Sequence, residues 1–92
     1  MKLYLIHTGF YDNNVADGFY EQHVNILIVA PTAYDAREKV KNTIEYKSKK
    51  MHIDGIKEII NIDGYSIALE KTDSKEQINT FNHLQVGFLK PE

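Results

Sequence analysis

The sequence has no cysteine, no tryptophan and only two prolines among its 92 residues. Without cysteine, disulfides, thiolate metal sites and cysteine nucleophiles are all excluded. No apolar run approaches the roughly 20 residues that a helix needs to span a bilayer. The apolar segment at the start is also too short for the hydrophobic region of a signal peptide. We therefore predict a cytoplasmic protein that makes no membrane contact.

A strong positive charge is also missing, since 11 basic and 13 acidic residues give a formal net charge of −2. Domains that bind nucleic acids by neutralising phosphates are usually strongly basic, so we expect no nucleic-acid partner. The sequence contains no G-x-S-x-G motif, no phosphate-binding glycine loop and no dinucleotide fingerprint. These absences predict no cofactor and disfavour an enzyme.

The remaining composition is typical of a globular chain, with 42% hydrophobic and 26% charged residues. A chain of this length forms a single domain, residues 1–92, because shorter pieces could not bury a core. So small a domain has little room for a substrate pocket of several hundred Å³. Docking a second copy would add apolar burial, and we therefore expect a homodimer.

Residues 2–8 alternate as in a strand, with Leu3, Leu5 and His7 on one face. Both faces are largely apolar, which is typical of a central strand, and Gly9 is expected to end it. A polar loop over residues 9–20 follows. Residues 22–30 predict a second strand, buried on both faces in its apolar half.

A helix is predicted to begin after Thr32, which is a suitable N-cap, and to run to about Lys49. Its apolar stripe contains Ala33, Ala36, Val40 and Ile44. Because a strand, a helix and another strand follow in order, we expect the two strands to be parallel, with a right-handed crossover.

A third strand is predicted within residues 52–62, where Gly55 indicates a bulge or a bend, so that the regular part would be only Ile56–Ile62. Asp63-Gly64 predicts a tight turn that pairs it with a fourth strand over residues 65–71. Residues 81–89 predict a last strand, which either completes this sheet or joins that of a second copy; the second alternative is slightly favoured.

The predicted fold class is therefore α+β, with a small mixed sheet of four to five strands packed by one main helix. The order is β-β-α-β-β, followed by the C-terminal strand. Residues 1–71 would form the core, and residues 72–92 an extension exchanged in a dimer.

Two pairs of polar residues are the candidates for chemistry: Glu21 with His23, and His52 with Asp54. Each pair lies two residues apart and so shares one strand face. If the two strand ends are neighbours, two imidazoles and two carboxylates converge. A hydrogen-bonding network is the favoured interpretation, ahead of a ligand site without metal and of a metal site.

Four aromatic residues, Phe10, Tyr11, Phe19 and Tyr20, belong to the predicted loop. They would either line a binding pocket or subunit contact, or fold back over the sheet edge and cover the core. The second interpretation is favoured.

These residues are compatible with two functions, one of a binding protein and one of an enzyme. The favoured one is a non-enzymatic binding module, acting as a homodimer with a protein or small-molecule partner. The alternative is a small acid/base or metal-dependent enzyme that uses Glu21, His23, His52 and Asp54.

Three blocks, Glu21–Val24, His52–Asp54 and Asp63–Ile67, occur in an order that resembles DUF1543, a family of small bacterial proteins of unknown function. The resemblance covers roughly residues 1–70. It implies one or two domain copies per chain, so single-copy chains would pair. The family's aromatic-rich segment near the helix end is replaced here by residues 47–51. The resemblance implies no activity, substrate or cofactor.

Overall fold

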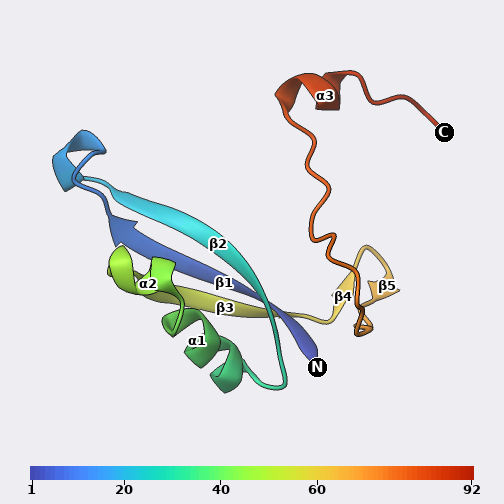
Figure 1. Ribbon diagram of the computed structural model, residues 1–92, viewed down its shortest axis with the longest axis horizontal. Helices are drawn as coiled ribbons and strands as arrows, with labels where there is room; N and C mark the ends of the chain where they lie inside the picture. The colour runs from blue at the N-terminus through green and yellow to red at the C-terminus, as the bar shows by residue number, and fades with distance from the viewer.

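The computed structural model describes all 92 residues and has an α+β fold. Three antiparallel strands, β1 (Lys2–Tyr11), β2 (Glu21–Ala30) and β3 (His52–Ile59), form a sheet in the order β2-β1-β3. Helices α1 (Ala33–Lys41) and α2 (Ile44–Ser48) cover one face of this sheet (Figure 1). The remaining elements are η1 (Ala16–Gly18), β4 (Asn61–Ile62), β5 (Tyr65–Ser66) and α3 (His83–Gly87).

The core lies between the sheet and α1. Alternate side chains of β1 point toward the helices, and Tyr4, Ile6 and Thr8 are almost completely buried there. Ala36 and Val40 of α1 pack against them and are fully buried. The predicted central place of the first strand is therefore confirmed. None of the helices has the length and apolar character needed to cross a bilayer.

The predicted mixed sheet of four to five strands was wrong, because the sheet has three strands and is wholly antiparallel. β2 and β3 do run in the same direction, but β1 lies between them and pairs with both. The reason is that β1 is apolar on both faces and pairs with β2 through a short local loop. β3 then pairs with the other edge of β1 and not with the free outer edge of β2, so no parallel pairing forms.

The single predicted helix is divided into α1 and α2 at Asn42 and Thr43. Thr43 accepts a hydrogen bond from the Tyr46 backbone N–H and so begins a new helix. This break changes the phase of the apolar stripe: Ile44 is 85% exposed, and Tyr46 packs against the core instead. The predicted cap at Thr32 is confirmed, since its hydroxyl accepts from the Asp35 N–H at 3.1 Å.

The Asp63-Gly64 turn is confirmed, and both residues have positive φ, 55° and 84°. Two consecutive positive φ values are the requirement of the tight turns that join hairpin strands. The hairpin is short, however: β5 ends at Ser66, so the strand predicted over residues 65–71 was wrong beyond that point. It also forms a separate two-stranded sheet.

The strand predicted over residues 81–89 was also wrong, because the segment contains α3 instead. Asn82 and Gln85 form a reciprocal capping box, a local interaction that needs no neighbouring strand. All residues from 70 to 92, here called the C-terminal arm, are exposed. The arm extends away from the sheet, with α3 far from the helices α1 and α2 (Figure 1).

Candidate functional site

The four polar candidates lie together on the face of the sheet opposite the helices, here called the helix-free face. Glu21 and His23 come from β2, and His52 and Asp54 come from β3. Between them runs β1, in which Gly9 is directly opposite His23 on one side and His52 on the other. Because Gly9 has no side chain, residues from the two outer strands can approach each other across it.

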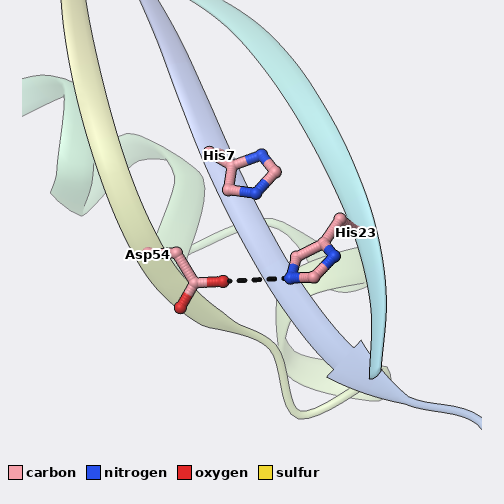
Figure 2. A group of neighbouring side chains, drawn as sticks. All are labelled: His7, His23 and Asp54. Carbon is pink, nitrogen blue, oxygen red and sulfur yellow. Dashed lines mark ion pairs between the residues drawn. The ribbon is translucent and has the colours of Figure 1, made fainter. Parts of the chain in front are cut away.

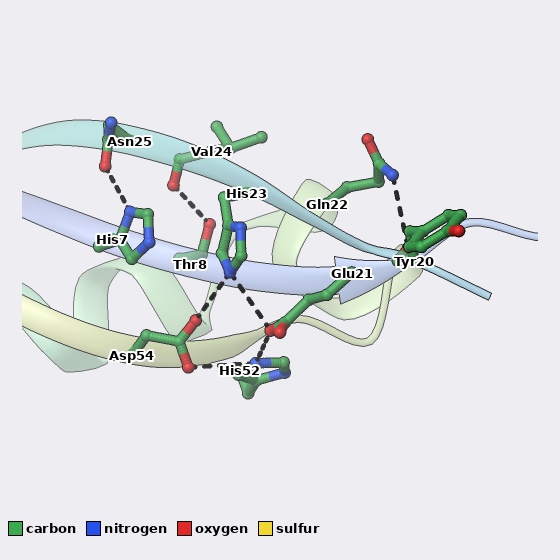
Figure 3. A network of polar contacts seen from close by, with 10 residues as sticks. All are labelled: His7, Thr8, Tyr20, Glu21, Gln22, His23, Val24, Asn25, His52 and Asp54. Atoms are coloured by element: carbon green, nitrogen blue, oxygen red, sulfur yellow. Dashed lines mark hydrogen bonds and ion pairs between the residues drawn. The ribbon is translucent and has the colours of Figure 1, made fainter. Parts of the chain in front are cut away.

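The two imidazoles and two carboxylates are within contact distance of one another (Figure 3). His52 Nε2 is 2.5 Å from Glu21 Oε1 and 3.2 Å from Asp54 Oδ1. His23 Nε2 is 3.5 Å from Glu21 Oε1 and 3.4 Å from Asp54 Oδ2. Their side chains are 30–47% exposed, so the cluster is open to solvent.

A bulge in β3 explains how Asp54 joins this cluster. The register with β1 passes from His7 opposite Gly55 to Thr8 opposite Ile53, leaving Asp54 without a partner. The extra residue resets the alternation of β3, so that Ile53 and Ile56, three residues apart, both pack against the core. The bulge that Gly55 indicated is therefore confirmed, but β3 is regular on both sides of it and not only from residue 56.

His7 and Asn25 extend the cluster along the helix-free face. The rings of His7 and His23 are stacked, with centroids 4.8 Å apart (Figure 2). His7 Nδ1 is 2.7 Å from the Asn25 side-chain oxygen, to which it donates because an amide oxygen only accepts. In the neutral ring the other nitrogen, Nε2, then has a free lone pair.

The sequence reasoning did not include His7 or Gly9 in the site, because it ended the first strand at Gly9. In the structure β1 continues to Tyr11 and Gly9 is buried within it. The backbone of Gly9 needs no positive φ. A Cβ there would lie 2.6 Å from His52 Nε2 and 2.9 Å from Asp54 Oδ2, and closer still to Glu21 Oε1. A side chain at this position would therefore compete for space with the polar ends of these three residues, whereas the backbone conformation allows any residue. The signal available in the sequence was a glycine flanked by strand-like residues on both sides.

The four aromatic residues do not form a common surface. Phe10 and Tyr11 belong to β1 and not to the predicted loop, because the strand continues past Gly9. Phe10 is 7% exposed, and the Lys49 ammonium lies 5.0 Å from its ring centre. Phe19 and Tyr20 contact each other edge to face and are exposed.

A hollow of about 500 Å³ adjoins the cluster on the helix-free face. It is lined by Leu5, His7, Asn25, Gly55, Ile56 and Lys57. Ligand pockets in proteins are usually between about 300 and 1,000 Å³. The expectation that so small a domain has little room for a pocket of several hundred Å³ was therefore wrong, although this hollow is open to solvent.

A protein-family model, described as a domain of unknown function (DUF1543), matches residues 18–69. The chain belongs to the DUF1543 family. The match begins just before Glu21 and ends just after the Asp63-Gly64 hairpin, so it contains all four polar candidates. Neither the curated proteins nor the solved structures include one that matches this chain. Membership of the family brings no activity with it.

Proposed function

We propose that this DUF1543 domain is a non-enzymatic binding module that works as a homodimer. The observation that supports this function most directly is a surplus of exposed surface. A folded monomer of 10.6 kDa typically exposes about 5,500 Å², whereas this chain exposes 8086 Å². The radius of gyration is 16.3 Å, against about 12 Å for a compact domain of this length.

The surplus, about 2,600 Å² per chain, is as large as a subunit contributes to an extensive obligate interface. Part of it lies at the apolar end of the helix-free face, where the polar cluster does not reach. By the strand register, the apolar side chains on that end are Leu3, Leu5, Leu27, Val29 and Ile59, and Lys57 lies beside Leu5 at the β3 edge. No helix of the chain covers them (Figure 1).

The C-terminal arm provides the complementary surface. Its larger apolar side chains are each more than half exposed, namely Ile78, Phe81, Leu84, Val86, Phe88 and Leu89. The chain enters the arm at the apolar end of the sheet, where Ile67 and Leu69 line a small hollow with Leu3 and Ile59. An arm from a second copy, placed on the helix-free face, would cover both surfaces at once.

The experiment is light scattering on the full chain over a range of concentrations, with Leu27→Glu as the interface variant. We expect a mass of about twice 10.6 kDa, and a dimer dissociation constant at least about tenfold weaker in Leu27→Glu, because a charge in a buried apolar contact costs more than 1.4 kcal/mol. The matched control is Ile44→Glu, which places the same charge at an exposed apolar position of α2. A monomer at tens of micromolar would overturn the proposal.

On this proposal the rest of the helix-free face, with the hollow beside His7, is the place where a small ligand binds. The mixed lining suits a partly apolar ligand with a polar group, since Leu5 and Ile56 are apolar and Asn25 and Lys57 are polar. The cytoplasmic location and the bacterial source stay predictions from the sequence.

The alternative function is a small enzyme, and the hollow beside two imidazoles and two carboxylates is the observation in its favour. The exposure of the cluster weighs against it, because acid/base sites work best where water is excluded. Turnover of an ester or phosphoester panel that is lost in His52→Ala, and kept in His83→Ala, would favour the enzyme.

A further inference from the structure

We propose that Glu21, His23, His52 and Asp54 form a binding site for a divalent transition-metal ion of the zinc type. Two imidazole nitrogens with two carboxylate oxygens are a donor set that suits Zn²⁺, Co²⁺ and Ni²⁺. All four ligands come from one chain, so this site does not depend on the dimer.

Three of the donors, from Glu21, His52 and Asp54, lie within 4.8 Å of one another, and His23 Nε2 is the fourth, 3.4–3.5 Å from both carboxylates. Ligand atoms held tetrahedrally at about 2.1 Å from zinc are about 3.4 Å from one another. His52 Nε2 is 3.2 Å from Asp54 Oδ1, whereas His23 Nε2 is 3.4 Å from Oδ2, the other oxygen of that carboxylate, and 3.5 Å from Glu21 Oε1. The fourth imidazole–carboxylate separation, between His52 Nε2 and Glu21 Oε1, is 2.5 Å and must lengthen when the ion replaces the shared proton.

The charge of the cluster also favours a cation. Two carboxylates, Glu21 and Asp54, converge on one point, and both form ion pairs only with histidines. No lysine or arginine neutralises them, and a neutral imidazole brings no charge. A divalent ion would compensate both carboxylates and satisfy the lone pairs of both Nε2 atoms.

The third observation in favour of a metal site concerns Gly9. Because this residue has no side chain, the space above it on the helix-free face is open to the neighbouring side chains. Donor atoms of Glu21, His52 and Asp54 all lie within 3 Å of the position that a Cβ would take. Three polar side chains from two strands thus turn inward over the centre of β1. A network that only bonded solvent or backbone would not need this convergence.

His7 is a positioning residue for this site. Its ring stacks on His23 and is held by Asn25, which limits the orientations open to the His23 imidazole. His7, His23 and Asp54 also bring one donor atom each to within 4.8 Å of one another (Figure 2).

The first experiment is calorimetric titration of the metal-free full chain with Zn²⁺, together with visible absorption on adding Co²⁺. We expect one ion per chain and the intense absorption of tetrahedral Co²⁺. Glu21→Gln and His52→Ala should each weaken binding by at least about tenfold, because each removes a ligand. The matched control is His83→Ala, which removes an exposed histidine of α3 and should leave binding unchanged.

A second variant, Gly9→Ala, tests the geometry without removing a ligand. We expect it to weaken binding by at least about tenfold, because the methyl group takes part of the space in which the donor atoms meet and moves them apart. Circular dichroism checks that the variant folds; if it does not, Glu21→Gln, which is almost isosteric and partly exposed, decides alone. No Zn²⁺ binding to the native chain, or equal binding in the native chain and in His52→Ala, would overturn the site and leave a hydrogen-bonding network. Neither result depends on whether the chain dimerises.

Discussion

The two faces of the three-stranded sheet are built from alternate residues of the same strands, but they have opposite characters. On the helix side β1 presents Tyr4, Ile6 and Thr8, which are at most 2% exposed. On the helix-free face it presents Leu5, His7 and Gly9, next to partly exposed polar residues. One face therefore stabilises the fold, and the other is available for binding. Substitutions on the two faces should separate these roles.

The largest effect on stability is expected for Ile6→Ala. Ile6 is fully buried within the core, so the change leaves a cavity and should lower the free energy of unfolding by about 2–5 kcal/mol. Chemical denaturation measures it, with Tyr11→Ala, an exposed residue of the same strand on the opposite face, as the control. If both variants lost the same stability, the contrast between the faces would be incorrect.

A smaller effect is expected for Thr8→Val, which keeps the shape of the side chain but removes its hydroxyl. Thr8 is fully buried and donates a hydrogen bond to the Val24 carbonyl at 2.9 Å. Losing it should cost about 1 kcal/mol in urea unfolding, because the carbonyl loses a partner. Thr8→Ser keeps the donor and serves as the control; equal losses in both would assign the effect to packing.

The third prediction concerns alkaline pH. Burial, with the Glu58 carboxylate beside it, raises the pKa of the Tyr4 hydroxyl above its usual value of 10. The folded state therefore keeps this proton to higher pH than the unfolded state, so this stability is full below pH 10 and is lost as the pH rises above it. Tyrosinate absorbance should show a late-titrating component that disappears in Tyr4→Phe. Its presence in that variant would contradict the assignment.

The smallest effect on stability is expected for His7→Phe, on the helix-free face. The change should alter the free energy of unfolding by less than about 0.5 kcal/mol, because the residue is outside the core. If the metal site is correct, Zn²⁺ affinity should fall severalfold, since the contact with Asn25 is lost. A large loss of stability would instead assign His7 a structural role.

Much of the candidate site was predictable from strand periodicity. Two-residue spacing alone put Glu21 with His23, and His52 with Asp54, on common faces. The exact register of β3 could not be predicted. Ile53 and Ile56 both point to the core while Asp54 points to the helix-free face, and this arrangement depends on the bulge opposite His7 and Thr8. The role of Gly9 was also hidden, since a glycine after an apolar run resembles a strand end.

The sequence by itself determined the local features of this protein: the alternation of β1, the cap at Thr32 and the turn at Asp63-Gly64. Each depends on side chains and backbone within a few residues, so neighbours in the chain contain the information. The tertiary structure decided that β3 pairs with β1 and not with β2, that β2 and β3 place their polar ends on either side of Gly9, and that residues 81–89 contain the helix α3 and no strand. These outcomes depend on which strand edges are free for pairing and which apolar faces other elements can cover. Both depend on contacts between residues far apart in the sequence.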